Sequence, residues 1–168
     1  MGKPSILIVD DKPENLHLLS DILLAENYAV RQAISGNMAL KSINFELPNL
    51  ILLDVNMPEM DGFELCFRLK KSERTKNVPI IFLSAQDDVV SKLKAFDVGG
   101  ADYITKPFRF QEVLIRVYRQ LAVHQKEQEL NDCHEKIAEL ETLTNILADK
   151  LDQARLLLEK AGIREIAL

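Results

Sequence analysis

Residues 50–62 read LILLDVNMPEMDG: four large apolar side chains, then Asp54, then a loop that contains Pro and Gly. A strand with one face in water alternates apolar and polar residues, whereas an unbroken apolar run is typical of a parallel strand buried on both faces. Residues 5–9 (SILIV) and 78–85 (VPIIFLSA) have the same unbroken pattern. These three runs therefore predict the centre of a parallel sheet that helices cover on both sides.

Helical patterns alternate with strand-like runs up to about residue 120. The three apolar runs, at residues 5–9, 50–55 and 78–85, are three of the expected strands. Two further strands over 28–33 and 102–105 would complete a sheet of five. Between the strands, apolar residues recur at helical spacing: Leu16, Leu19, Leu23 and Leu24; Met38, Leu40, Ile43 and Phe45; Phe63, Leu65, Cys66, Phe67 and Leu69; Val89, Val90, Leu93 and Phe96. Pro13 suits a first helical turn. This repeat predicts an α/β fold with a doubly wound, five-stranded parallel sheet.

The fifth helix is expected to begin at Phe108 or Arg109 and to continue past the globular part of the chain. Its inner face would carry Phe110, Val113, Leu114, Val117 and Leu121. Residues 119–168 contain no Pro, no aromatic residue and one Gly, so nothing in the sequence before that Gly stops the helix. We therefore expect a globular domain over residues 4–122 and a helical extension over residues 123–168.

A seven-residue apolar repeat runs through this extension. Its a positions are Leu130, Ile137, Thr144, Leu151 and Leu158, and its d positions are Cys133, Leu140, Leu147, Ala154 and Ala161. A repeat sustained over more than four heptads predicts a coiled coil, and we expect a parallel homodimer. The alternative is a helix that folds back onto its own domain.

The charged residues beside this seam support a parallel pair only in part. The residues that would face each other across the two chains are Lys136 and Glu141, Glu129 and His134, and Lys150 and Arg155. The first two pairs are complementary and the third is repulsive. Thr144 and the two Ala positions also weaken the seam, so we expect a dimer of modest affinity.

The composition excludes several classes of protein. The chain has 168 residues with 21 basic and 26 acidic side chains, which gives a net charge of −5. Residues 119–168 hold seven basic and ten acidic side chains, so direct contact with nucleic acid is not expected. Cys66 and Cys133 are too few for a disulfide framework. No signal peptide is visible and no apolar stretch approaches the roughly 18 residues of a membrane span, so we expect a cytoplasmic protein.

Polar residues follow the predicted strands at the ends where ligands bind in a doubly wound sheet. They are Asp10 and Asp11 after the first strand, Asp54 on the third, Ser84 on the fourth and Lys106 after the fifth. Three carboxylates close together repel one another and need a cation. Oxygen ligands select a hard ion, and a site with few carboxylates and room for water favours Mg²⁺ over Ca²⁺.

Asp54 is the candidate nucleophile of this site. It leaves a buried strand with its side chain free to act. A carboxylate beside Mg²⁺ and a lysine can attack a phosphoryl group and hold the resulting acyl phosphate. Ser84 could donate a hydrogen bond to a phosphoryl oxygen.

Five landmarks occur in order along the chain: Asp10-Asp11, DVNMPEMDG at residues 54–62, Ser84-Ala85, Tyr103, and Lys106-Pro107-Phe108. Together they resemble the receiver domain of two-component response regulators, over about residues 4–122. The resemblance implies a flavodoxin-like sheet with strand order 2-1-3-4-5. It also implies that a sensor histidine kinase or a phosphotransfer protein phosphorylates Asp54, and that the chain is an acceptor and not a multiple-turnover enzyme.

The same resemblance implies a role for each site residue. The ligands of Mg²⁺ would be the carboxylates of Asp10, Asp11 and Asp54 and the backbone carbonyl of Asn56. Lys106 would pair with the phosphoryl group, and its peptide bond to Pro107 would be cis. Ser84 would move toward the phosphoryl group while Tyr103 rotates inward, and this switch would remodel the face formed by the fourth helix, the fifth strand and the fifth helix.

Other readings of the same residues stay open at this point. A phosphatase that acts on small phosphate esters through an aspartyl phosphate needs an acid two residues after its nucleophile, where this chain has Asn56. A flavin-binding module needs a phosphate loop after the first strand, where Asp10 and Asp11 would repel a phosphate. The chain could also be the N-terminal part of a longer protein with an output enzyme. In a structural role, Asp10 or Asp11 could cap the helix that starts at Pro13.

Overall fold

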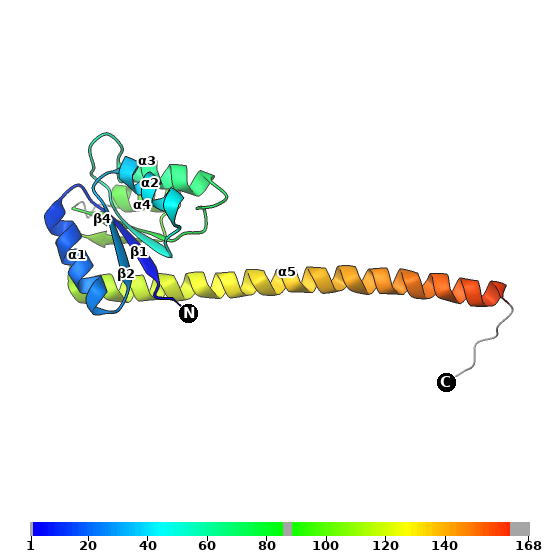
Figure 1. Ribbon diagram of the computed structural model, residues 1–168. Coiled ribbons are helices and arrows are strands. Elements are labelled where there is room, and N and C mark those ends of the chain that lie inside the picture. The colour runs from blue at the N-terminus through cyan, green and yellow to red at the C-terminus, as the bar shows by residue number, and fades with distance from the viewer. Residues whose placement is uncertain (1, 86–88, 162–168) are drawn as a thin grey trace. The chain divides into compact units, whose positions relative to one another are not determined.

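The computed structural model describes residues 2–85 and 89–161, and the chain divides into two compact units, Met1–Gln125 and Lys126–Leu168. Strands and helices alternate in the first unit (Figure 1). The strands are β1 Ser5–Val9, β2 Ala29–Ala33, β3 Leu50–Asp54, β4 Ile80–Ser84 and β5 Asp102–Thr105. The helices are α1 Pro13–Ala25, α2 Gly36–Phe45, α3 Gly62–Lys71, α4 Val89–Asp97 and α5 Phe110–Lys160.

The five strands form one parallel sheet in the order β2-β1-β3-β4-β5, which confirms the expected topology. Asp54 of β3 pairs in register with Leu83 of β4, and Ser84 pairs with Thr105 of β5. All residues of β3 and β4 are buried, as their unbroken apolar runs predict. Because the strands are parallel, the polar residues that follow β1, β3, β4 and β5 all lie at one edge of the sheet.

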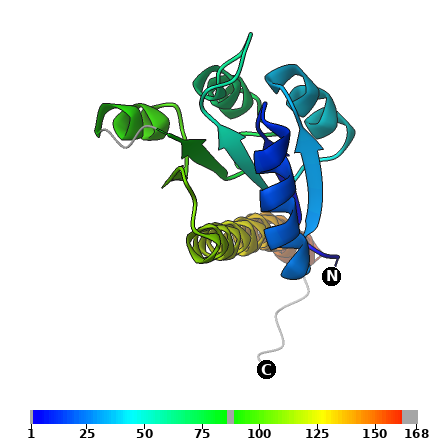
Figure 2. The same ribbon diagram turned by 90° about the vertical axis from the view of Figure 1, so that its left-hand side faces the viewer.

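Helices cover both faces of the sheet (Figure 2), so the doubly wound architecture is confirmed. On one face, α1 and α5 pack through fully buried side chains such as Leu19 and Val113. On the other face, α2, α3 and α4 contribute Ile43, Leu65 and Ala95 to a second core. The sheet therefore has an apolar layer on each face, and the polar residues of the predicted site lie at the carboxyl ends of its strands.

Several apolar residues at helical spacing are not buried, and one of them, Phe110, belongs to the predicted inner face of the fifth helix. In α4, the predicted stripe of Val89, Val90, Leu93 and Phe96 is more than half exposed, and the small Ala95 is the buried residue. The helical period identifies the helix, but the packing of neighbouring elements decides which side it buries. Phe110 at the start of α5 is also exposed, while Val113 and Val117 are fully buried. Other stripe residues that lie outside the core are Leu24, Met38, Phe45 and Phe67.

The boundaries of the elements differ from the prediction by at most two residues. β4 begins at Ile80 and not at residue 78. Pro79 lacks the N–H that a central strand donates, so it stands outside the strand. α5 begins at Phe110, slightly later than expected, and Pro13 occupies the first turn of α1 as predicted.

In the second unit, α5 continues from Lys126 to Lys160, and every residue described there is exposed. The hydroxyl of Thr144 donates a hydrogen bond to the carbonyl of Leu140 at 2.8 Å, so this polar group is satisfied within its own helix. The coiled coil and the dimer stay predictions, and residues 162–168 of the expected extension lie outside the described residues. Across the described ranges, α5 included, no helix is both long and apolar enough to span a bilayer.

The loop after β3 turns back against the strand at Gly62. The Gly62 N–H donates to the carbonyl of Val55 at 2.9 Å, and a Cβ at Gly62 would lie 2.2 Å from the carbonyl oxygen of Asp54. Asp61 is the N-cap of α3, and its side chain accepts a hydrogen bond from the N–H of Glu64 at 2.7 Å. The loop therefore leaves no room for a side chain where it presses on the backbone of Asp54.

We expect Gly62→Ala to lower the free energy of unfolding by about 1–3 kcal/mol, the usual cost of forcing an extra carbon into a packed site. The contact is with backbone, which cannot move aside without disturbing β3. Urea denaturation followed by circular dichroism measures the change. Gly2→Ala is the matched control, because nothing lies within 4 Å of a Cβ built there. Equal stability of the two variants would contradict the tight contact.

Candidate functional site

Three carboxylates meet at the carboxyl edge of the sheet. Asp10 and Asp11 follow β1, and Asp54 is the last residue of β3. One carboxylate oxygen from each lies within 4.8 Å of the others. Asp10 and Asp54 are buried, at 0% and 4% exposure, and Asp11 is partly buried. Among the residues that the structure describes, no other group of His, Cys, Asp or Glu side chains converges in this way.

Lys106 reaches the cluster from the end of β5. Its Nζ lies 2.6 Å from Oδ1 of Asp54 and 2.8 Å from Oδ2 of Asp10. The Lys106 N–H donates to the carbonyl of Ser84 at 2.7 Å, and the peptide bond between Lys106 and Pro107 is cis. The Lys106 ammonium therefore bridges the two buried carboxylates of Asp10 and Asp54. It does not neutralise the negative charge of the third carboxylate, that of Asp11.

The loop after β1 and the first turn of α1 hold Asp10 in place. Its Oδ1 accepts a hydrogen bond from the backbone N–H of Lys12 at 2.9 Å, and its Oδ2 accepts one from Nδ2 of Asn15 at 2.9 Å. Neither Asp10 nor Asp11 caps α1: the N-cap is Lys12, without a side-chain cap, so that alternative is wrong. The carboxylate of Asp10 is instead engaged by Lys12, Asn15 and Lys106.

Asp11 has an unusual oxygen. Its Oδ1 is buried and has no hydrogen-bond partner among the described residues. A buried polar atom without a partner costs free energy unless a ligand or an ion completes it. Together with two neighbouring carboxylates, this oxygen fits a site for a hard divalent cation, as the oxygen-only donor set predicts.

The pKa values of the central pair follow from burial and charge. Burial raises the pKa of the Asp54 carboxyl, the hydrogen bond and charge of Lys106 act in the opposite direction, and Asp10 and Asp11 raise it further. Burial alone would lower the pKa of the Lys106 ammonium, but its hydrogen bonds to Asp10 and Asp54 outweigh this and raise it. Lys106 is therefore held as a cation. At Asp54, the positive charge of Lys106 does not offset the combined effect of burial and of the neighbouring carboxylates.

The other predicted site residues lie on β4, on β5 and in the loop after β3. Ser84 is the last residue of β4 and is fully buried. Tyr103 is 5% exposed and belongs to the core beneath α2, α3 and α4, so its ring lies inside the protein in this structure. Asn56 lies two residues beyond β3, and its side chain is exposed. The structure thus brings together the aspartates and Lys106, with Ser84 on the neighbouring strand.

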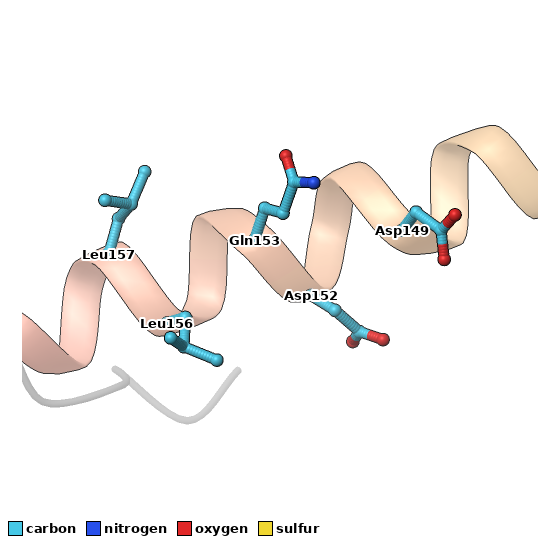
Figure 3. A pocket seen from close by; sticks show the side chains of 5 residues that line it. All are labelled: Asp149, Asp152, Gln153, Leu156 and Leu157. Atoms are coloured by element: carbon cyan, nitrogen blue, oxygen red, sulfur yellow. The ribbon is translucent and has the colours of Figure 1, made fainter.

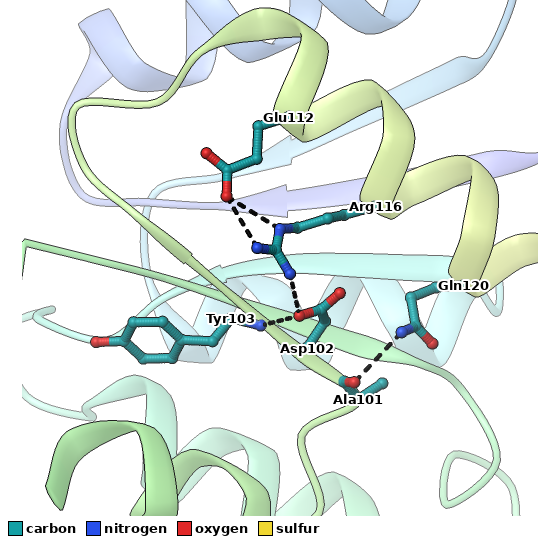
Figure 4. Close-up of polar contacts among 6 residues, drawn as sticks. All are labelled: Ala101, Asp102, Tyr103, Glu112, Arg116 and Gln120. Atoms are coloured by element: carbon teal, nitrogen blue, oxygen red, sulfur yellow. Dashed lines mark hydrogen bonds and ion pairs between the residues drawn. The ribbon is translucent and has the colours of Figure 1, made fainter. Parts of the chain in front are cut away.

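A second polar network, which the sequence analysis did not single out, joins β5 to α5 (Figure 4). The Arg116 guanidinium donates to Oδ1 of Asp102 at 2.6 Å and to Oε1 of Glu112 at 3.0 and 3.1 Å. Asp102 also accepts the backbone N–H of Tyr103 at 2.8 Å. The four-residue spacing of Glu112 and Arg116 is a signal for a helical ion pair. The contact between Arg116 and Asp102 joins α5 to β5, and no spacing in the sequence indicates it.

The fold and the site define the class of flavodoxin-like signalling domains that carry an acidic cluster and a lysine at the carboxyl edge of the sheet. Residues 6–118 match the sequence profile of the response regulator receiver domain. The chain belongs to this family.

Similar proteins of known sequence agree with this assignment. The chain is 42% identical over 115 residues to the DNA-binding dual master transcriptional regulator RpaA of Synechocystis sp., a match that covers 68% of this chain and 47% of RpaA. It is 41% identical over 102 residues to the response regulator PleD of Caulobacter vibrioides, which covers 61% of this chain and 22% of PleD. The chain thus spans less than half the length of these two curated relatives.

Solved structures give the same result. The chemotaxis protein CheY4 of Vibrio cholerae superposes with a TM-score of 0.68 at 29% identity, over 70% of this chain and 98% of that one. The receiver domain of a signal transduction histidine kinase from Syntrophus aciditrophicus superposes with a TM-score of 0.67 at 34% identity, over 71% and 90% of the two chains. The superposed part corresponds to the first unit in size.

We expect Mg²⁺ to raise the thermal midpoint of unfolding. An ion that binds only the folded protein stabilises it by about 2.7 kcal/mol at a concentration 100 times its Kd. Asp11→Asn should remove most of this shift, because it takes a charge from the cluster. Asp21→Asn, on the exposed face of α1, is the matched control and should respond like the unaltered chain. Scanning fluorimetry with and without Mg²⁺ measures the shift, and an undiminished shift in Asp11→Asn would argue against the site.

Proposed function

We propose that the first unit accepts a phosphoryl group on Asp54 and acts as the switch of a two-component signalling system. The observation that carries this proposal is the position of the Asp54 carboxylate. It is buried at the end of β3, 2.6 Å from the Lys106 ammonium and beside two further carboxylates. A carboxylate in such a setting can act as a nucleophile toward phosphorus and keep the product shielded from water.

The donor is a sensor histidine kinase or a phosphotransfer protein, as membership of the receiver family supports. In the transfer, an oxygen of Asp54 forms a bond to phosphorus while the bond from phosphorus to the donor's imidazole nitrogen breaks. The product is an acyl phosphate on Asp54. Each chain accepts one phosphoryl group, so the domain is a switch and not a multiple-turnover enzyme.

The neighbouring residues stabilise the charge of that phosphoryl group. Mg²⁺ would be held by the carboxylates of Asp10, Asp11 and Asp54 and by the backbone carbonyl of Asn56, and when bound it would neutralise phosphoryl oxygens. The Lys106 ammonium, already beside Asp54, would exchange part of its contact with the carboxylate for one with a phosphoryl oxygen. The hydroxyl of Ser84 would donate to another.

We further propose that Ser84 and Tyr103 form the switch. Ser84 follows the residue that pairs with Asp54 in the sheet, so it is close enough in register to respond to a new group there. The Tyr103 ring is already inside the core, so the inward position is available without a phosphoryl group. Through Asp102 and Arg116, the strand that carries Tyr103 is tied to α5.

For the tail, we propose a parallel homodimer through residues 123–168. Its apolar side chains are exposed in the single chain: Leu130, Ile137, Leu140, Leu147, Leu151 and Leu158 are 47–63% exposed. A surface hollow on this seam is lined by Ile137, Leu140, Glu141, Thr144 and Asn145. Positions a, d, e and the next a form the hole that receives a d-position side chain in a parallel coiled coil, here Leu140 of the second copy. The acidic tail favours protein partners over nucleic acid.

A second candidate is that the chain is the receiver part of a longer signalling protein. The observation that favours it is the length of the relatives, since the match covers only 22% of PleD and 47% of RpaA. In that arrangement the tail would lead to an output domain. Phosphoryl acceptance by Asp54 is the same in both cases.

We expect a small phosphodonor such as acetyl phosphate, with Mg²⁺, to place one phosphoryl group on each chain. Asp54→Asn should abolish this, because an amide is not a nucleophile toward phosphorus, and should leave the circular dichroism spectrum unchanged. Intact mass spectrometry measures the label, and Asp21→Asn is the control that should be labelled normally. Label on Asp54→Asn would refute the site, and sustained turnover of phosphate esters would refute the switch.

Mild oxidation is expected to join two chains through Cys133, which is exposed and occupies a d position of the seam. A parallel, in-register pair places the two thiols side by side, whereas an antiparallel pair separates them. Cys66 should not react, because it is buried and burial raises the pKa of its thiol to about 11. Non-reducing electrophoresis measures the product, with Cys133→Ser as the control.

The seam itself is tested by removing residues 123–168. The shortened chain should sediment as a monomer and still accept a phosphoryl group on Asp54. A dimer that survives this truncation would mean that another surface, and not the tail, holds the two copies together.

A further inference from the structure

The tail changes character near residue 142. In the first half, the positions that flank the seam are charged, as in Glu129, Lys136 and Glu141. In the second half, the large residues Leu143 and Ile146 lie outside the seam and are 54% and 47% exposed. A narrow seam at a and d is typical of a two-stranded coil, whereas a wider apolar face is typical of a helix that contacts more than one neighbour.

These two residues belong to a separate stripe on the helix. Glu139, Leu143, Ile146 and Lys150 follow one another at spacings of four, three and four residues, which places them along one line of an α-helix. This line lies roughly 110° around the helix from the seam, given 3.6 residues per turn. We call it the flanking stripe. In a two-stranded coil through the seam, Leu143 and Lys150 flank the seam, while Glu139 and Ile146 are left in water.

The flanking stripe is complementary to itself when one copy is reversed. An antiparallel pair centred between Leu143 and Ile146 places Leu143 of each chain against Ile146 of the other. The same alignment places Glu139 of each chain against Lys150 of the other, so both ends carry an opposite-charge pair. In a twofold interface between identical chains, residue i of one chain contacts residue j of the other, and residue j of the first contacts residue i of the second. The two pairs described here have this reciprocal form.

We propose that the flanking stripe binds the flanking stripe of a second copy in antiparallel orientation, so that dimers of this chain associate further. The proposal rests on the parallel dimer proposed above. It also accounts for Lys150, which faces Arg155 of its partner in that dimer but meets Glu139 of a reversed copy. Each dimer has two such stripes, one on each chain, so association is not limited to a single pair of dimers.

Another exposed part of the tail lacks this complementarity. A shallow hollow beyond the stripe is lined by Asp149, Asp152, Gln153, Leu156 and Leu157 (Figure 3). Among the described residues that line it, two are carboxylates and none is basic, so these side chains of two copies facing each other would repel. Asp149 therefore provides a control position for charge changes that should not affect association.

The test is sedimentation equilibrium of the full chain and of charge variants, from low to high micromolar concentration. We expect the weight-average mass of the unaltered chain to reach at least twice the mass of the dimer at high concentration. Lys150→Glu should hold the protein at the dimer, since a carboxylate at position 150 would face Glu139 of the reversed copy but would attract Arg155 across the seam. Combining Lys150→Glu with Glu139→Lys should restore the larger species, and Asp149→Lys should behave like the unaltered chain.

Two results would overturn the proposal: a dimer mass for the unaltered chain at every concentration, or larger species that persist in Lys150→Glu. Rescue by the double exchange is specific to the antiparallel alignment, because a parallel one places residue 139 against residue 139. A monomer at all concentrations would remove the coiled-coil dimer as well. Labelling of Asp54 by acetyl phosphate, measured on the same samples, reports separately whether the switch function holds.

Discussion

The site depends on an imbalance of charge in a small buried space. Three carboxylates converge at the carboxyl edge of the sheet, and one ammonium, that of Lys106, bridges two of them. Like charges at this distance with little water raise the free energy of the ionised state. The folded protein therefore has an excess of negative charge at this site, at Asp54 and at the buried Oδ1 of Asp11, which a cation would neutralise.

The parallel sheet makes this arrangement possible. Its apolar strands are covered by helices on both faces, and the polar residues at their ends are collected from positions far apart in the sequence. The loop after β3 then presses against the Asp54 backbone at Gly62, where even a methyl group would collide. The backbone that carries Asp54 is thus closely packed on the side of Gly62, and a bound cation would offset the excess negative charge at its side chain.

Much of the fold could be predicted from sequence, because unbroken apolar runs and the order of polar residues at strand ends are local signals. The cluster of aspartates and Lys106 followed from that order together with the sheet topology. The buried side of α4 could not be predicted, since the helical period of its large apolar residues does not reveal that Ala95 is the buried side chain. The hydrogen bond from Asn15 to Asp10 was missed because it depends on how the loop after β1 places the first turn of α1.

Thr144 has a consequence for how the tail would select a partner helix if it forms the proposed coiled coil. It occupies a core position of the seam, yet its hydroxyl is already bonded to the carbonyl of Leu140 in the same helix. A buried Asn at such a position fixes the alignment of two helices by bonding across to its counterpart. Thr144 makes no such demand. In the proposed coiled coil, the seam at this level would therefore discriminate between helices by shape and volume and not by a hydrogen bond between the chains.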